Sequence, residues 1–194
     1  MIIAEDFIKN ENVCLILGDN IFHGISDIEV SKTGATVFGY EVINPSAYGV
    51  VSFDSYGNPI SMEEKPLYPT SKYAMPGLYF YDKNAVEYAR SLVPSARGEL
   101  EITHLNKLYL EKKEITVIKL KKGTVWLDAG TPESLFQSSA YIQAIQSRQG
   151  TMVGCIEEEC LKKGFLDKNQ LTNLICRIPN SEYRNYLTSL LLNE

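Results

Sequence analysis

The stretch Leu15-Ile16-Leu17-Gly18-Asp19-Asn20 decides which fold we expect for this chain. An apolar run that ends abruptly in Gly-Asp-Asn is typical of a buried strand that carries a carboxylate to the end of a sheet. Open α/β folds bind their ligands at such strand ends. We therefore expect an α/β fold in which Asp19 is placed to bind a metal ion or another ligand.

A second segment, Thr124-Val125-Trp126-Leu127-Asp128-Ala129-Gly130-Thr131, repeats this arrangement far along the chain. A short strand ends in a carboxylate, and a glycine turn and a helix follow. Thr131 is a suitable N-cap for that helix, and Pro132 suits its first turn. Because hard cations prefer carboxylate oxygens, Asp19 and Asp128 together predict a site for one cation.

The size and charge of the chain limit its function further. Its 194 residues are enough for one main domain with an appendage. The net charge of −5 leaves no broad basic surface, which argues against binding to a nucleic-acid polymer. Small anionic ligands remain possible.

The cysteines argue against a zinc site, because they form no CxxC pair and have no histidine close in sequence. We expect Cys14 to be a small buried hydrophobe inside its strand. The cysteines suit a reducing compartment, no apolar run approaches the ~18 residues of a membrane span, and the N-terminus lacks a basic signal region. We therefore expect a soluble cytoplasmic protein. The four cysteines are Cys14, Cys155, Cys160 and Cys176.

Hydrophobic spacing predicts the order of helices and strands. A helix tail over residues 1–8 precedes the first strand, so the domain begins in mid-helix and we expect the sequence to be incomplete at its N-terminus. We expect residues 1–150 to form the main domain and residues 151–194 a helical appendage. The further strands are predicted at 35–43, 50–54, 60–63, 73–81 and 115–120, with 50–54 and 60–63 antiparallel; the helices are predicted at 84–92, 100–112, 132–148, 157–163, 168–176 and 181–192.

Three short motifs are ambiguous when each is taken alone. Tyr48-Gly49-Val50-Val51 offers a backbone that a ligand can approach closely, but it also suits an ordinary turn. Glu63-Glu64-Lys65-Pro66 suits a solvated strand end. Arg97-Gly98-Glu99-Leu100-Glu101-Ile102-Thr103 suits an exposed helix start, although Arg97 is free to meet a phosphate.

Taken in order, these motifs closely resemble the glucose-1-phosphate thymidylyltransferases, the enzymes that make dTDP-glucose. The matching segments also include Leu17-Gly18-Asp19-Asn20, the run Tyr73-Ala74-Met75-Pro76-Gly77-Leu78-Tyr79-Phe80-Tyr81-Asp82, and Trp126-Leu127-Asp128-Ala129-Gly130-Thr131. The order and context of the motifs carry the specificity. The resemblance covers the chain to about Gly150 and extends to its helical tail. It implies the Rossmann-like mixed sheet of a nucleotidyltransferase.

The resemblance also implies roles for individual residues. Asp19 and Asp128 are expected to bind a catalytic Mg²⁺, and Lys65 to act with them on the phosphates. Met75 occupies a position where the family usually has valine, so it keeps an apolar surface of a different shape. Core packing is an equal alternative for Tyr79 and Trp126. The expected contacts to the nucleotide-sugar come from Asn20, Gly49, Glu64, Lys65, Met75, Tyr79, Arg97 and Trp126.

The implied reaction needs no protein nucleophile. A phosphate oxygen of glucose 1-phosphate attacks the α-phosphorus of dTTP, and pyrophosphate leaves, while Mg²⁺ offsets the developing charge. Lys65 and Arg97 hold the sugar phosphate, and Glu64 accepts hydrogen bonds from sugar hydroxyls. The resemblance further implies a homotetramer and a role in nucleotide-sugar biosynthesis, including the dTDP-rhamnose route.

One departure from the family pattern is an absence. The family opens with a Gly-Gly-x-Gly-Thr-Arg-Leu loop and a Lys-Gln-Leu-Leu-Pro segment, and this sequence contains neither. That loop would surround the triphosphate with backbone N–H groups. We therefore expect an N-terminally truncated enzyme with the sugar-phosphate and metal half of the site and little activity alone. The alternatives are a catalytically silent sugar-phosphate-binding or oligomerisation module, and a uridylyl or cytidylyl transferase.

Overall fold

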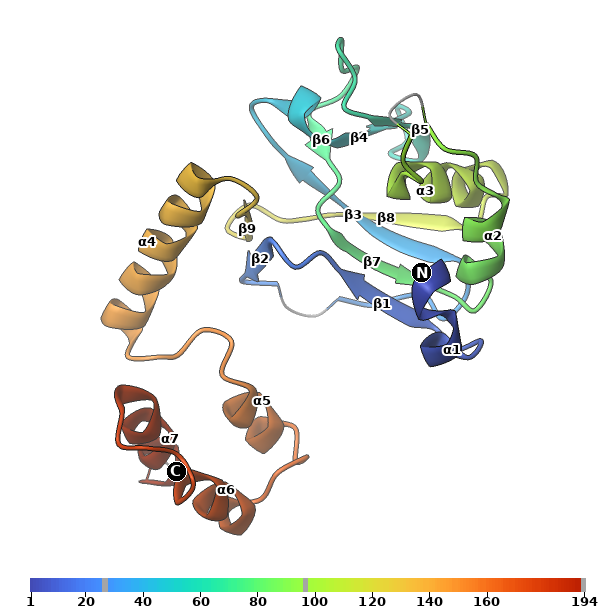
Figure 1. Cartoon of the computed structure of the whole chain (residues 1–194). Helices are drawn as coiled ribbons and strands as arrows, with labels where there is room; N and C mark the ends of the chain where they lie inside the picture. The colour runs from blue at the N-terminus through green and yellow to red at the C-terminus, as the bar shows by residue number, and fades with distance from the viewer. Residues whose placement is uncertain (26–27, 96–97, 193–194) are drawn as a thin grey trace. The chain divides into compact units, whose positions relative to one another are not determined.

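The computed structural model describes residues 1–25, 28–95 and 98–192. The chain divides into two compact units, Met1–Ser134 and Leu135–Glu194, which we describe separately (Figure 1). Within the described residues, no helix is both long and apolar enough to cross a bilayer. The expected division into residues 1–150 and 151–194 stays a prediction.

The first unit is built on a mixed sheet, which confirms the predicted α/β class. Strand β1 (Val13–Ile16) pairs antiparallel with β7 (Leu78–Tyr81), and β7 pairs antiparallel with β3 (Ala35–Glu41). On the other side of β3, β8 (Ile115–Lys119) runs parallel to it. A parallel neighbour requires a crossover connection, and the segment between β7 and β8 supplies the helices of that crossover.

The sheet has a second branch that begins at the end of β3. There β3 pairs with β6 (Tyr73–Ala74), β6 pairs with β4 (Gly49–Phe53), and β4 pairs with β5 (Pro59–Glu64). The Asp54 carboxylate accepts a hydrogen bond of 2.8 Å from the backbone N–H of Asn58 and so closes the β4–β5 turn. The predicted antiparallel pairing of these two strands is confirmed.

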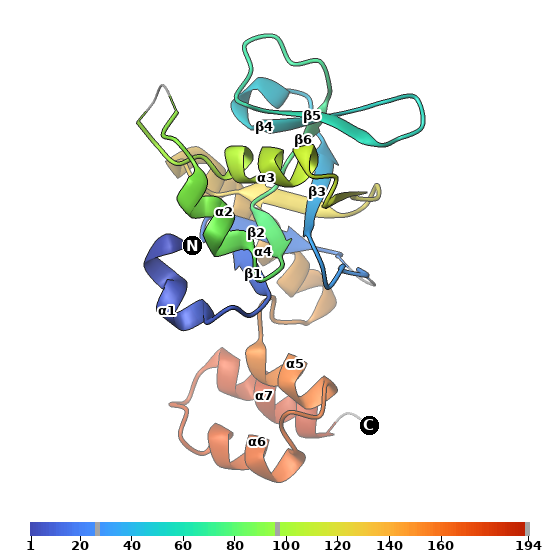
Figure 2. The same cartoon turned by 90° about the vertical axis from the view of Figure 1, so that its right-hand side faces the viewer.

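Two helices of the crossover cover one face of the sheet (Figure 2). They are α2 (Ala85–Ser91) and α3 (Ile102–Glu111). Leu105 and Tyr109 of α3 are fully buried against side chains of β3 and β7, and the apolar area removed from water there is the main source of stability for this unit. The core residues around them are Ala35, Val37, Val51, Met62, Met75, Tyr79, Tyr81 and Ala85.

The N-terminal segment is helical, as its spacing predicts. It forms a 3₁₀ turn, η1 (Ile2–Ala4), followed by the short helix α1 (Glu5–Ile8). An ion pair between Arg90 of α2 and Glu5 of α1 links this segment to the crossover helices. A second 3₁₀ turn, η2 (Pro45–Ala47), leads into β4.

Two sequence predictions about strands are wrong. Strand β1 was expected to be buried, but among the described strands it pairs with β7 on one side and with none on the other, so Cys14 is exposed and Ile16 is 55% exposed. The run 73–81 was expected to be one strand, but it forms the separate strands β6 and β7. Pro76 lies between them and has no N–H to donate to a ladder, so the pairing is interrupted there.

The second unit is helical, as predicted for the chain beyond Gly150. Helix α4 (Pro132–Gln149) crosses the boundary and lies in this unit from residue 135 onward, and α5 (Ile156–Lys162), α6 (Lys168–Ile175) and α7 (Glu182–Leu192) pack on one another. Thr131 caps α4 as expected, because its hydroxyl accepts a 3.1 Å hydrogen bond from the Ser134 N–H. The buried core of this unit consists of Cys155, Leu171, Ile175 and Leu187.

Candidate functional site

A two-stranded ribbon places the two predicted metal ligands side by side. Strand β2 (Asn20–His23) pairs antiparallel with β9 (Val125–Asp128), and Asn20 lies opposite Asp128 in this register. Asp19 directly precedes β2, and its carbonyl oxygen accepts a 2.7 Å hydrogen bond from the Ala129 N–H. Asp19 and Asp128 are therefore at the same end of the ribbon.

The two carboxylates face one small space beside Gly130. A Cβ built on Gly130 would lie 3.0 Å from Asp128 Oδ1 and 3.2 Å from Asp19 Oδ2, so the two oxygens are no farther apart than the sum of these distances. The Gly130 N–H donates to Asp128 Oδ1 at 2.9 Å, and Asn20 Nδ2 donates to Asp19 Oδ1 at 2.7 Å. Two hard oxygen donors directed at one space suit a hard divalent cation.

Within the described residues, the carboxylate pair does not belong to a larger cluster of histidine, cysteine or acidic side chains. Over residues 1–25, 28–95 and 98–192, the chain has no group of three or more histidine, cysteine or acidic side chains that could hold a metal ion. A cation bound here would therefore take its remaining oxygen ligands from water or from a substrate. Mg²⁺ commonly binds in this way, with one or two carboxylates plus phosphate oxygens and water.

A cavity of about 220 Å³ opens next to the carboxylate pair. It is lined by residues from the β1–β2 turn, the start of β4, the end of β5, the β6–β7 connection, the first turn of α3, and β9. Arg97, the remaining predicted site residue, lies outside the described residues. The predicted site residues that line the cavity are Asp19, Asn20, Gly49, Glu64, Lys65, Met75, Tyr79, Trp126 and Asp128.

Gly49 allows three side chains of the cavity to approach its backbone. A Cβ there would lie 2.9 Å from Thr103 Oγ1, 3.0 Å from Met75 Cε and 3.2 Å from Glu64 Oε2. The Met75 N–H donates to the Gly49 carbonyl at 2.7 Å, and the Thr103 hydroxyl donates to Glu64 Oε2. The absence of a side chain at Gly49 therefore lets Glu64 be held against α3 at the edge of the cavity.

Lys65 contributes a positively charged ammonium group to the cavity, and its backbone has an uncommon conformation. Its φ is +42°, which is uncommon for a residue other than glycine, and Pro66 follows it. The Lys65 N–H donates to the Tyr48 carbonyl at 3.1 Å, which extends the β4–β5 pairing by one residue. Its side chain is exposed and has no carboxylate partner among the described residues, so it is available to an anion.

Two aromatic side chains form one wall of the cavity. We call Tyr48 and Trp126 the aromatic wall, because both line the cavity and their rings meet edge-to-face at a centroid distance of 4.9 Å. Tyr40, which is not part of the lining, packs edge-to-face on Trp126 at 5.7 Å. Trp126 is 9% exposed. Burial raises the pKa of Tyr48, and the nearby charge of Asp128 raises it further. Tyr48 is therefore a neutral hydroxyl at physiological pH.

Tyr79 combines core packing with a place at the cavity. It is 3% exposed and stacks on Tyr81 at a centroid distance of 6.0 Å. Burial raises its pKa well above the ordinary value for tyrosine, and the charge of Glu64 adds to this effect. Tyr79 and Trp126 are both buried and both line the cavity, so packing and ligand contact are compatible roles.

Sequence reasoning missed several residues of the cavity. Tyr48 and Thr103 stand inside motifs that were singled out, but neither was predicted to contribute to the site. The signal for Thr103 was its position in the first turn of α3, directly after the helix start. Leu17 and Gly77 also line the cavity, and the Leu17 N–H donates to the Gly77 carbonyl at 2.9 Å. No spacing rule connects those two segments.

Comparison with known proteins identifies relatives of the chain. A family model described as nucleotidyl transferase matches residues 1–145. The glucose-1-phosphate thymidylyltransferase of Neisseria meningitidis serogroup A / serotype 4A is 46% identical over 196 residues, which cover 98% of this chain and 68% of the relative. The Mycolicibacterium smegmatis enzyme of the same name is 46% identical over 199 residues, which cover 100% of this chain and 69% of the relative. The chain thus spans about two thirds of the length of these relatives.

Solved structures agree with this assignment of the fold. A structure from Bacillus anthracis in complex with sucrose aligns with a TM-score of 0.62 at 39% identity, covering 72% of this chain and 58% of that chain. The structure of UDP-glucose pyrophosphorylase complexed with UDP-glucose aligns with a TM-score of 0.61 and covers 74% of this chain and 60% of that chain. Its 24% identity supports the fold alone.

Proposed function

The chain belongs to the glucose-1-phosphate thymidylyltransferase family of nucleotidyl transferases, and from this we propose that its cavity binds glucose 1-phosphate and Mg²⁺. The activity in which it takes part is the formation of dTDP-glucose and pyrophosphate from dTTP and glucose 1-phosphate. One observation supports this most strongly: motif residues from six separate parts of the chain line the same cavity. Base selection rests on family membership alone.

The sugar is recognised by one acidic side chain against apolar surfaces. Glu64 accepts hydrogen bonds from sugar hydroxyls, and Thr103 holds its carboxylate in place. Met75 and Tyr79 are buried beside it and exclude water from one side of the ring. Gly49 leaves room for the sugar to approach the backbone of β4.

The phosphate is held by charge. The Lys65 ammonium pairs with the phosphate of glucose 1-phosphate and orients one oxygen toward the α-phosphorus of dTTP. Attack by that oxygen forms the new P–O bond, and pyrophosphate leaves, so no covalent bond to the protein is needed. Arg97 is proposed to assist Lys65.

Asp19 and Asp128 would hold the cation, because their oxygens face one space and no lysine or arginine of the described residues pairs with either. Mg²⁺ bound there supplies positive charge that offsets the negative charge on the phosphate oxygens. Neither carboxylate is needed as an acid or a base. A homo-oligomer and a place in nucleotide-sugar biosynthesis, including the dTDP-rhamnose route, are part of the same proposal.

A second candidate function is a sugar-phosphate-binding or oligomerisation module without catalysis. The observation that favours it is that the described cavity residues account for the sugar phosphate and the cation, while base selection rests on family membership alone. Both candidates bind glucose 1-phosphate, but only the enzyme releases pyrophosphate from dTTP. A pyrophosphate-release assay on the chain separates them.

Calorimetric titration of the chain with glucose 1-phosphate in the presence of Mg²⁺ tests the shared part of the proposal. Lys65→Ala should raise the dissociation constant about tenfold, because it removes a charge-assisted contact to the phosphate. Lys113→Ala is a matched control, since Lys113 is also exposed and has a positive φ of 58°. Equal affinities for both variants would contradict the assigned site.

A further inference from the structure

The side-chain amide of Asn20 joins three parts of the cavity. Its Oδ1 accepts a 2.6 Å hydrogen bond from the Trp126 indole Nε1 and a 2.9 Å hydrogen bond from the Gly77 N–H. Its Nδ2 donates to Asp19 Oδ1 at 2.7 Å. One amide therefore connects the aromatic wall, the β6–β7 connection and the carboxylate pair.

The chemistry of the three partners fixes the orientation of this amide. An indole N–H and a backbone N–H only donate, so both must face the oxygen of Asn20. Because a carboxylate only accepts, Asp19 must face the NH₂ group. If the amide were rotated by half a turn, its NH₂ group would face the two N–H donors and its oxygen would face the Asp19 carboxylate. Neither arrangement forms a hydrogen bond, so only the observed orientation satisfies all three partners.

The three partners differ in what they do in the proposed function. Asp19 faces the cation space, Trp126 belongs to the aromatic wall, and Gly77 lines the cavity two residues after Met75. Trp126 and Gly77 are both at least half buried, so neither N–H can easily exchange Asn20 for bulk water. The hydrogen bonds of Asn20 therefore form a direct path from the Asp19 carboxylate to the indole.

We propose that Asn20 is a positioning residue that couples cation binding at Asp19 and Asp128 to the shape of the aromatic wall. The inference rests on the proposed function and deepens it, because it gives Asn20 a role toward its protein partners in addition to the expected contact to the nucleotide-sugar. Side chains that orient metal ligands from behind commonly change metal affinity 10–100-fold when removed. Coupling of this kind acts equally in both directions, from cation to wall and from wall to cation.

Trp126 is the only tryptophan of the chain, so its fluorescence reports on the wall directly. Titration with Mg²⁺ alone should change the Trp126 emission of the unmodified chain. In Asn20→Ala, Mg²⁺ should bind about tenfold more weakly by calorimetry, and the emission should not respond even when the site is saturated. If the charge of bound Mg²⁺ changed the Trp126 emission directly, without Asn20, the response would persist in this variant. The comparison therefore separates a direct electrostatic effect from coupling through Asn20.

Asn58→Ala provides a matched control. Asn58 Nδ2 also donates to an aspartate, Asp54 Oδ2, at 3.0 Å, but in the β4–β5 turn. This variant should keep both the Mg²⁺ affinity and the Trp126 response of the unmodified chain. A loss of either would show that the Asn20→Ala effect is not specific to the site.

The outcomes distinguish this inference from the function on which it rests. An unmodified chain that binds no Mg²⁺ would overturn both, whereas an Asn20→Ala chain with a full Trp126 response at saturation would overturn the coupling alone. If Asn20→Ala fails to fold, Trp126→Phe removes one donor and keeps an aromatic ring. Calorimetry should then show weaker Mg²⁺ binding, and an unchanged affinity would refute the coupling.

Discussion

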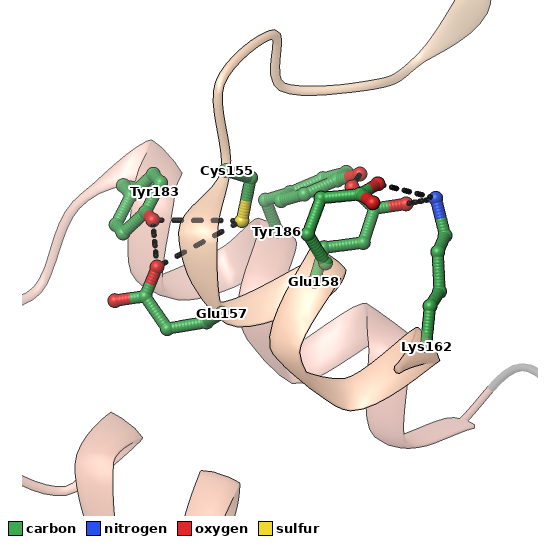
Figure 3. Close-up of polar contacts among 7 residues, drawn as sticks. Cys155, Glu157, Glu158, Lys162, Tyr183 and Tyr186 are labelled. Carbon is green, nitrogen blue, oxygen red and sulfur yellow. Dashed lines mark hydrogen bonds and ion pairs between the residues drawn. The ribbon is translucent and has the colours of Figure 1, made fainter. Parts of the chain in front are cut away.

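Two pairs of acidic side chains, one pair in each unit, have different kinds of partners. In the C-terminal unit, Tyr183 donates a hydrogen bond to Glu157, and Tyr186 donates to Glu158 at 2.5 Å (Figure 3). Lys162 Nζ lies 2.9 Å from the Glu158 carboxylate. In the N-terminal unit, Asp19 and Asp128 receive hydrogen bonds from amide groups, but no cationic side chain of the described residues pairs with them.

This difference separates carboxylates that stabilise the fold from carboxylates that are available to a ligand. Burial by itself raises the pKa of Glu158, but hydrogen bonds from Lys162 and Tyr186 outweigh it and hold the pKa below the ordinary value. The ionised form of Glu158 is thus stabilised within the protein. Asp19 and Asp128 converge without such a partner, so an added cation is the natural source of compensating charge.

The largest expected effect on Mg²⁺ affinity comes from replacing one carboxylate by an amide, and the same replacement in the other unit is the control. Asp128→Asn should weaken Mg²⁺ binding by on the order of 100-fold, because it removes both a ligand charge and half of the carboxylate pair. Glu157→Gln should leave Mg²⁺ binding unchanged. Calorimetry with Mg²⁺ on both variants measures this. If the two variants lose affinity equally, the comparison between the units fails.

A smaller effect is expected from adding one methyl group in each unit. Gly130→Ala places a Cβ 3.0 Å from Asp128 Oδ1 and 3.2 Å from Asp19 Oδ2, so Mg²⁺ affinity should fall about tenfold with little change in stability. Gly164 meets nothing within 4 Å, but its φ of +73° is unfavourable for alanine. Gly164→Ala should cost about 1 kcal/mol of unfolding free energy and leave Mg²⁺ binding intact.

Chemical denaturation and Mg²⁺ titration of these two glycine variants provide the check. The expected pattern is a loss of metal affinity in one variant and a loss of stability in the other. A Gly130→Ala chain that is destabilised but binds Mg²⁺ normally would show that Gly130 has a structural role only.

The smallest expected effect concerns pH and the C-terminal unit. Because the folded pKa of Glu158 lies below its unfolded value, its ionised form stabilises the fold above about pH 4.3, the ordinary glutamate pKa. This stabilisation is lost as the pH falls through the folded pKa. Glu158→Gln should therefore cost about 0.5 kcal/mol near neutral pH.

Denaturation of Glu158→Gln and of the unmodified chain at several pH values tests this. The difference in unfolding free energy should be present at pH 7 and should disappear as the pH falls through the lowered folded pKa of Glu158, below which the carboxyl group is protonated in both states. A difference that grows in acid would mean that the carboxyl group stabilises the fold in its neutral form.

The parts of the fold that depend on local pattern could be predicted from the sequence. The β4–β5 hairpin follows from a turn between two β-rich runs, and the capped start of α4 follows from Thr131 and Pro132. The parts that depend on neighbours far along the chain could not. The apolar residues of β1 do not reveal that it lies at the edge of the described sheet, paired with β7, and this edge position leaves Cys14 exposed.

The candidate site shows the same limit. Asp19 and Asp128 could be named from the sequence because each stands at the end of a predicted strand, whereas Glu64 was named through the resemblance of its motif to the family. The hydrogen bonds of Asn20 to Trp126 and Gly77 join positions 106 and 57 residues apart, and no periodicity predicts such contacts. The three-dimensional structure was needed to show which motif residues share partners.

The central claim is that Asp19 and Asp128 form the cation site of this chain, and anomalous diffraction from crystals soaked in Mn²⁺ tests it most directly. Mn²⁺ takes the same oxygen ligands as Mg²⁺ and is visible by its anomalous signal. We predict a single strong peak within bonding distance of an oxygen of Asp19 and an oxygen of Asp128, beside Gly130. A peak at the Glu157–Glu159 cluster with none beside Gly130 would contradict this account.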